Sequence, residues 1–213
     1  MPILRYDTIQ NALPGVLMQP FGPIIYKTDI TAECLDRLTT LTANSRNNDD
    51  MRPGLAGNLS DEKLLNIDDA SALEIIEHCA VLQTALWNMP KESIKHFTRK
   101  MLIDNIWVNY QKAFEWNPLH SHTGDISFVI YIANPIDYEL EKKHPTQRAN
   151  TPTAGKISFR YGEKHPMSNH TFMHIPVAGE MFCFPAWLEH QVFPFTTEGI
   201  ERISIAGNIS INN

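Results

Sequence analysis

Apolar positions in the first hundred residues follow helical spacing. Leucines recur at three-residue intervals from Leu35 onward, shortly after Thr31, a residue type that caps helices. A longer apolar series predicts a second helix over residues 69–88, and Pro90 would end it. Residues 91–100 add a shorter helical segment. This part of the chain is therefore predicted to be mainly helical.

Two further segments of this part have a different pattern. Residues 20–30, with the sequence PFGPIIYKTDI, combine prolines with β-branched and aromatic residues and predict one short strand. Residues 44–58, with the sequence NSRNNDDMRPGLAGN, are polar and rich in turn-forming residues. They predict a loop that connects the first two helices.

The second half of the chain consists of short runs rich in β-branched and aromatic residues. Glycine or proline separates the runs, and no helical pattern lies between them. The predicted strands are residues 106–111, 127–133, 156–161, 171–176, 180–184, 191–195 and 202–211. Such a series is typical of a sandwich, jelly roll or barrel. We expect a mainly β fold in a single domain, in which residues 1–100 form a helical buttress on one face of a β core at residues 101–213.

Composition narrows the class of protein further. The 213 residues include 43% hydrophobic and 20% charged side chains, as in ordinary globular proteins. A net charge of −6 argues against a broad basic face, so nucleic acid is not an expected partner. No apolar run suits a membrane helix, and the N-terminal residues show no signal peptide. Cys34, Cys79 and Cys183 form no CxxC motif, which indicates reduced thiols in a cytoplasm.

Histidines provide the candidate chemistry of the second half. His120 and His122 are two residues apart, and alternate residues of an extended chain point to the same side. Asp125 follows closely, and His190 belongs to a later segment that a jelly roll can bring alongside. Two or three imidazoles with a carboxylate and open positions suit a mononuclear catalytic metal. Because an HxH pair also occurs on ordinary surfaces, its meaning depends on the residues that follow.

The last predicted strand carries a second polar group. Arg202, Ser204, Ala206 and Asn208 alternate with other residues and share one face of this strand. An arginine on an interior face can hold a carboxylate through two parallel hydrogen bonds. The alternative is an ion pair between Arg202 and a neighbouring glutamate at the end of the strand. The order of HxH, a distant histidine and RxS favours a metal site combined with an anion site.

This order resembles that of the iron(II)- and 2-oxoglutarate-dependent oxygenases, whose double-stranded β-helix carries H-x-D/E, a distant His and R-x-S. The similarity extends over residues 106–211, about half of the chain. It is greatest to the small 2-oxoglutarate oxygenases of bacteria and marine phages, because HSH, FPAWLEHQVFP and RISIAGN match that family in order. The segments FGPII and RPGLAGN resemble it as well. The resemblance implies a cupin-like jelly-roll core.

The resemblance also implies individual roles. His120 and His190 match the first and the distal iron ligands. The residues that match the cosubstrate site are Arg202, Ser204, Tyr131 and either Asn109 or Tyr110. The arginine, with the serine, would hold the distal carboxylate of 2-oxoglutarate, and Tyr131 would contact the same carboxylate. The residue on the earlier strand would contact the other end of the cosubstrate.

One position departs from the family pattern, because His122 stands where the family has Asp or Glu. Three arrangements are open. His122 completes a three-histidine site, Asp125 supplies a displaced carboxylate, or the iron has two protein ligands and space for another anion. We favour His122 because, two residues from His120 on an extended chain, it points to the same side as His120. An all-histidine site carries one more positive charge than the usual site, which is expected to raise the iron potential.

We therefore expect an iron(II)- and 2-oxoglutarate-dependent dioxygenase that hydroxylates an unidentified substrate and releases succinate and carbon dioxide. Its expected partners are 2-oxoglutarate, dioxygen and that substrate, in a cytoplasm (the host's for a phage protein), and a homodimer is a further hypothesis. Residues 135–154 are a candidate substrate lid, and Trp116 and Trp187 are candidate walls of the site. Two alternatives are a cupin-like jelly-roll metalloenzyme that does not use 2-oxoglutarate and a non-catalytic binding protein on the same fold.

Overall fold

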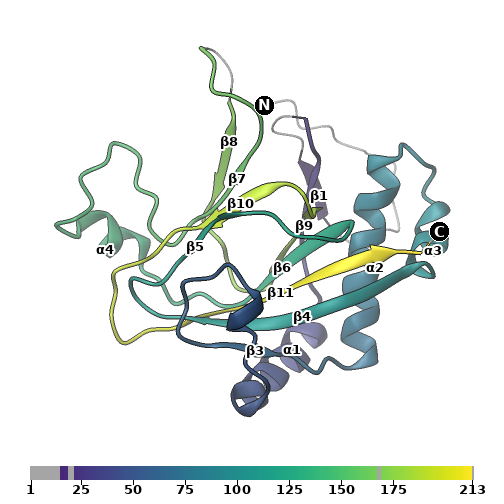
Figure 1. The fold of residues 1–213 in the computed structure, drawn as a ribbon, viewed down its shortest axis with the longest axis horizontal. Helices are drawn as coiled ribbons and strands as arrows, with labels where there is room; N and C mark the ends of the chain where they lie inside the picture. Colours follow the sequence, from purple (N-terminus) through teal and green to yellow (C-terminus); the bar gives the residue numbers. More distant parts are fainter. Residues whose placement is uncertain (1–14, 19–21, 167–168, 213) are drawn as a thin grey trace.

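Two antiparallel sheets pack against each other, and helices lie on the outer side of the larger sheet (Figure 1). The computed structural model describes residues 15–18, 22–166 and 169–212. The larger sheet has the order β1 (Gly15–Met18), β2 (Ile25–Asp29), β9 (Glu180–Pro185), β6 (Ile126–Ala133), β11 (Arg202–Ile211), β4 (Met101–Gln111) and β3 (Glu62–Leu64). The smaller sheet has the order β5 (Asn117–His120), β10 (Glu189–Val192), β7 (Ile157–Arg160) and β8 (Thr171–His174). The predicted mainly β fold with flanking helices is confirmed.

The predicted helices are present on the larger sheet. They are α1 (Ala32–Asn44), α2 (Asp69–Leu86) and α3 (Ser93–Thr98). Thr31 caps α1 by accepting a hydrogen bond from the Cys34 amide at 3.2 Å. Asp68 caps α2 in the same way, accepting from the Ser71 amide at 2.9 Å. Along the described part of the chain, no helix combines the length and the apolar character needed to span a bilayer.

All seven strands predicted in the second half are present, although their ends differ. β10 begins at Glu189 rather than at residue 191, so His190 itself lies on a strand. The sequence pattern missed β1, β3 and β5. β5 contains Pro118 and is the edge of its sheet, where proline is tolerated, and β3 has only three residues. Neither strand shows the alternation on which the prediction depends.

The first hundred residues are not only helical, because β1, β2 and β3 form the two edges of the larger sheet. β2 lies within the strand predicted at residues 20–30, of which Pro20 and Phe21 fall outside the described residues. The division of the chain at residue 100 and its organisation as a single domain stay predictions.

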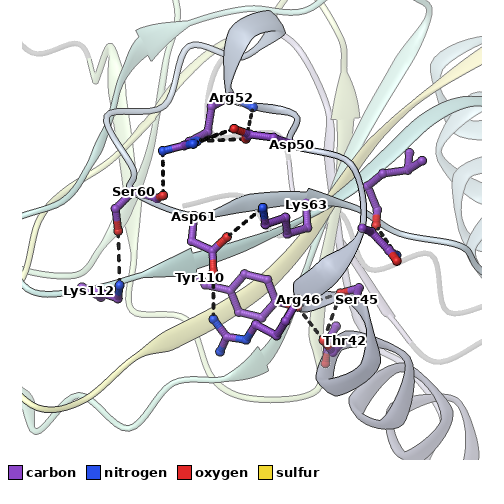
Figure 2. A network of polar contacts seen from close by, with 12 residues as sticks. Thr42, Ser45, Arg46, Asp50, Arg52, Ser60, Asp61, Lys63, Tyr110 and Lys112 are labelled. Carbon is purple, nitrogen blue, oxygen red and sulfur yellow. Dashed lines mark hydrogen bonds and ion pairs between the residues drawn. The ribbon is translucent and has the colours of Figure 1, made fainter.

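The predicted loop at residues 44–58 is ordered by polar contacts (Figure 2). It contains two short 3-10 turns, Ser45–Asn47 and Arg52–Gly54. The guanidinium of Arg52 pairs with Asp50 at 2.6 Å and donates to the Ser60 carbonyl at 2.9 Å. The Met51 amide donates to the backbone carbonyl of the first residue of β3 at 3.0 Å. The loop is therefore attached to the outer edge of the larger sheet.

Two apolar cores flank the larger sheet. One lies between this sheet and the helices and includes Ile75, Leu82 and Val108. The other lies between the two sheets and includes Phe159 and Phe182. Because both faces of the sheet are covered, its central strands are buried on both sides, as β6 is at seven of its eight positions.

His78 of α2 is buried in the first core, beside the ring of Tyr26. Its Nε2 atom has no hydrogen-bond partner among the described residues, and burial lowers its pKa from 6.5 to about 4. The unfolded chain binds a proton near pH 6.5 that the folded protein binds only near pH 4. The free energy of unfolding therefore decreases as the pH falls through this interval, by up to about 1.4 kcal/mol per pH unit for this residue.

We expect the substitution His78→Leu to remove this contribution. Urea unfolding measured between neutral pH and about pH 4.5 should give a weaker dependence of the free energy of unfolding on pH, by about one proton. His96→Leu, at an exposed histidine of α3, serves as the control and should leave the dependence unchanged. An identical pH dependence in the wild type and in His78→Leu would contradict this account.

Candidate active site

Three histidines converge where the smaller sheet faces the larger one. β5 and β10 are neighbours, and His120 lies directly opposite His190 in their register. His122 follows β5, and its amide donates to the Ala186 carbonyl at 2.8 Å. A ligand atom of each of the three imidazoles lies within 4.8 Å of those of the other two. Among the described residues, this is the group of side chains that could hold a metal ion.

The chemistry of these histidines suits a divalent metal. Burial lowers the pKa of all three, to about 4 for His122 and about 3 for His190, so they are neutral at physiological pH. The Nδ1 atoms of His120 and His190 lie 2.6 Å and 2.9 Å from the carbonyl oxygens of Pro118 and Leu188. Because a carbonyl only accepts, each Nδ1 carries the proton, and the Nε2 lone pair is free for a metal.

Asp125, the alternative third ligand, is directed elsewhere. The intervening Gly124 has a φ of 95°, which turns the chain after His122. The Asp125 carboxylate accepts a hydrogen bond from the Ile211 amide at 2.8 Å, at the opposite end of β11 from Arg202. The structure brings together His120, His122 and His190 and leaves Asp125 outside the group.

The histidines line a pocket between the sheets together with residues from β4, β6 and β11. The other polar or aromatic residues of this lining include Trp107, Asn109, Gln111, Asn117, Tyr131, Arg202 and Ser204. The register of the larger sheet explains their convergence, because Ser204 lies between its partners Asn109 on β4 and Tyr131 on β6. Paired residues on neighbouring strands point to the same face.

Of the two alternatives on β4, Asn109 lines the pocket and Tyr110 does not. Tyr110 points to the helical side, where its hydroxyl donates to the Thr42 carbonyl at 2.5 Å and lies 2.7 Å from the Ser45 hydroxyl (Figure 2). The prediction that Tyr110 contacts the cosubstrate is therefore corrected. Strand alternation is the reason, since adjacent residues point to opposite faces of the sheet.

Arg202 is a buried cation that has no carboxylate partner in the described part of the chain. Its side chain is only 2% exposed, and burial lowers its pKa. It donates to the Gly155 carbonyl at 2.5 Å and to the side-chain oxygen of Gln111, both of which are neutral groups. Its Nε atom and the buried hydroxyl of Tyr131 have no partner among the described residues. An uncompensated buried charge is costly, so this end of the pocket is suited to an anion.

A chain of contacts joins the anion end of the pocket to the histidines. The Ser204 hydroxyl lies 3.4 Å from the Asn109 amide nitrogen, and the Asn109 oxygen accepts from Trp107 Nε1 at 3.1 Å. The Trp107 ring lies 5.8 Å from that of His122, measured between centroids. Trp107, Gln111 and Asn117 were not among the predicted site residues. Trp107 and Gln111 lie two residues on either side of Asn109 on β4, so strand alternation could have identified them. Asn117 lies on β5, which the sequence pattern missed.

The candidate lid and walls lie outside this lining. Residues 135–154 contain the helix α4 (Tyr138–Lys143), so the prediction that no helix lies between the strands of the second half is wrong. The buried Glu141 of this helix accepts hydrogen bonds from the amides and hydroxyls of Thr196 and Thr197, at 2.6 to 3.0 Å. Trp116 and Trp187 are 43% and 55% exposed and are absent from the pocket lining. The segment is thus tied to the loop before β11, and its role as a lid stays a prediction.

Two facing antiparallel sheets enclose three histidines that could hold a metal ion and, in the same pocket, a buried arginine with neutral partners. This arrangement suits a jelly-roll metal site beside an anion site. Residues 105–208 match the model of a family described as "Putative 2OG-Fe(II) oxygenase". This part of the chain is therefore similar to the iron(II)- and 2-oxoglutarate-dependent oxygenases, as the resemblance of its motifs predicts. No curated protein matches the chain.

Several solved structures are similar to this chain at low sequence identity. The HygX structure from Streptomyces hygroscopicus, with nickel, 2-oxoglutarate and hygromycin B bound, has a TM-score of 0.50, 9% identity, and coverage of 88% of this chain and 82% of that chain. A Pseudomonas putida prolyl-4-hydroxylase has a TM-score of 0.48, 13% identity, and coverage of 88% and 92%. A viral collagen prolyl hydroxylase from Paramecium bursaria Chlorella virus-1 has a TM-score of 0.48, 14% identity, and coverage of 87% of this chain and 94% of that chain. The similarity to HygX confirms the predicted jelly-roll fold.

Proposed function

We propose that this oxygenase binds iron(II) through His120, His122 and His190 and binds 2-oxoglutarate through Arg202, and that it hydroxylates a C–H bond of an unidentified substrate. The observation that carries this proposal is the buried guanidinium of Arg202, whose partners among the described residues are all neutral, in the same pocket as the three neutral histidines. A jelly-roll metalloenzyme that does not use 2-oxoglutarate would have no need of a buried cation there.

The side chains of the pocket divide into two groups. At one end, the Nε2 atoms of His120 and His190 are oriented for a metal by backbone carbonyls. At the other end, Arg202 Nε, the Tyr131 hydroxyl and Ser204 are donors for the distal carboxylate of 2-oxoglutarate. When bound, iron(II) and 2-oxoglutarate supply the family's chemistry, in which dioxygen is activated as the 2-oxo acid is converted to succinate and carbon dioxide.

Apolar residues of the pocket have a separate function. Phe128, Val129 and Phe184 line the same space and exclude water from the polar groups. In a dry pocket, the attraction between a guanidinium and a carboxylate is stronger than in bulk water. No side chain has to act as a general base in this proposal, since the protein holds the ligands and positions the substrate.

The third ligand distinguishes this site from the usual pattern of its family. Three neutral imidazoles leave the metal with its full charge, whereas a carboxylate ligand would reduce it by one. We propose His122 as this ligand, because its ring lies 4.8 Å from that of His120 and 5.0 Å from that of His190, measured between centroids. The extra positive charge favours anionic ligands in the open positions, and 2-oxoglutarate is such a ligand.

Formation of succinate tests the proposed reaction. The protein, supplied with iron(II), 2-oxoglutarate and air, should form succinate slowly even without its substrate, and NMR of the reaction mixture would detect it. Removal of iron with a chelator should stop the reaction, and restoring iron should restart it. If the 2-oxoglutarate is not consumed by iron-loaded protein, the proposed activity is wrong. The predicted homodimer and the predicted absence of nucleic-acid binding stay predictions.

A further inference from the structure

Glu62 is a buried carboxyl group that forms no ion pair with any described residue. Its side chain is 1% exposed, and Oε2 makes no hydrogen bond within the described residues. The nearest arginine in sequence, Arg52, is engaged by Asp50 and by the Ser60 carbonyl (Figure 2). Because a carboxylate buried without a cation is unfavourable, this group requires an explanation beyond packing.

The position of Glu62 relates it to the active site. In the register of β3 with β4, Glu62 is the direct partner of Asn109, so both side chains point to the same face of the sheet. Asn109 lines the pocket that contains the three histidines. Glu62 therefore lies one strand further out, on the inner face of the larger sheet, next to the pocket.

A second unpaired acceptor lies beside it. Asn117 lines the same pocket, and its side-chain oxygen is buried without a hydrogen-bond partner among the described residues. This oxygen and Glu62 Oε1 each lie 2.7 Å from the position that a Cβ atom on Gly57 would occupy. The two oxygens are therefore no further apart than twice that distance. Rotating the Asn117 amide by 180° would give Glu62 one neutral donor and would still leave its charge without a cation.

We propose that Glu62 and Asn117 form a subsite for a cationic nitrogen, an ammonium or guanidinium group, of the oxygenase substrate. This inference rests on the proposed function and adds the chemical class of the substrate. A carboxylate and an amide oxygen offer only acceptors to such a group, which is rich in donors and carries the missing positive charge. Gly57 lies against the subsite without a side chain, so no Cβ atom occupies the point that is 2.7 Å from both oxygens.

Isothermal titration with n-butylguanidinium, and with the neutral n-butylurea as its isostere, tests the subsite. The protein is used with iron(II) and 2-oxoglutarate under anaerobic conditions. We expect n-butylguanidinium to bind. The Kd of n-butylurea should be at least about tenfold higher, because the urea carries no positive charge to pair with Glu62. Equal binding of the two probes, or no binding of the guanidinium, would overturn the proposal.

Two variants locate the binding. Glu62→Gln should raise the Kd of n-butylguanidinium at least about tenfold. Gly57→Ala places a methyl group against both oxygens and should weaken the same binding, whereas Gly54→Ala, where nothing lies within 4 Å of the new Cβ atom, is the matched control. Binding unchanged in both Glu62→Gln and Gly57→Ala would place the guanidinium elsewhere and overturn the proposal.

The pH dependence of binding gives an independent result. The pKa of Glu62 is raised to about 7, mainly by burial and to a smaller extent by Asp50 and Glu115, against a lowering effect of Arg52. Since the ionised form attracts the cation, the Kd should fall as the pH rises through about 7, and Glu62→Gln should lose this dependence. A guanidinium probe stays protonated over this range. The same pH profile in wild type and Glu62→Gln would argue against the subsite.

The failure of this inference can be distinguished from the failure of the proposed function. 2-Oxoglutarate is titrated into iron(II)-loaded protein of the same preparation. Protein that binds 2-oxoglutarate and does not bind n-butylguanidinium keeps the proposed function and loses the subsite. Protein that binds n-butylguanidinium through Glu62 and does not bind 2-oxoglutarate keeps the subsite and loses the proposed cosubstrate.

Discussion

Arg202→Ala is expected to abolish specific binding of 2-oxoglutarate. Arg202 is 2% exposed, its partners among the described residues are neutral, and it is the cation proposed for the distal carboxylate. Removing one partner of a buried charge pair costs about 3 kcal/mol or more, which corresponds to a rise in Kd of at least about 100-fold. Anaerobic calorimetry with iron(II)-loaded protein would measure the change directly.

A thermal-shift measurement gives a second readout for this variant. A ligand that binds only the folded protein raises its melting temperature, so 2-oxoglutarate should stabilise the wild type and not Arg202→Ala. Arg160→Ala is the matched control, because this arginine is exposed at the end of β7 and is absent from the pocket lining. If Arg202→Ala kept the affinity for 2-oxoglutarate, the assignment of the anion end of the pocket would be wrong.

His122→Ala is expected to reduce iron(II) affinity more than about 100-fold. Loss of a group that only orients a ligand costs roughly 10- to 100-fold in metal affinity, and a direct ligand should cost more. Competition with a chromophoric chelator under anaerobic conditions would measure the affinity. His120→Ala and His190→Ala should have effects of the same order if the three histidines act as one set.

Asp125→Ala provides the comparison for the third ligand. Its carboxylate is bonded to the Ile211 amide, so we expect a modest loss of stability and no change in iron affinity. The reverse outcome, with iron affinity lost in Asp125→Ala and kept in His122→Ala, would make Asp125 the ligand. Unchanged affinity in both variants would indicate a metal held by two protein ligands.

Much of the site could be predicted from strand parity. His120 and His122 are two residues apart, as are Arg202 and Ser204 on the last strand, so each pair is predicted to point to one side. Both pairs line the pocket. Parity alone did not decide between Asn109 and Tyr110. β4 is buried at every position from 106 to 111, with helices on one face and the second sheet on the other, so its sequence has no polar face to mark the outside.

Other features depend on long-range contacts that the sequence pattern does not contain. Gly124 adopts a positive φ and turns the chain so that the Asp125 carboxylate reaches the Ile211 amide. Counting alternate residues from His120 along an extended strand does not predict this contact. Glu62 lies in a three-residue strand beside a polar loop and carries no periodic signal. Only its pairing with Asn109 shows that it faces the inside of the molecule.

The central claim is that the histidine group holds iron(II) and that 2-oxoglutarate binds next to it on Arg202. Anaerobic titration of 2-oxoglutarate into the iron(II)-loaded protein, followed by visible absorbance, tests it most directly. The account predicts a metal-to-ligand charge-transfer band that grows to saturation at one equivalent and is lost in Arg202→Ala. Protein that binds iron and shows no such band with 2-oxoglutarate would contradict the account and favour a jelly-roll metalloenzyme with a different cosubstrate.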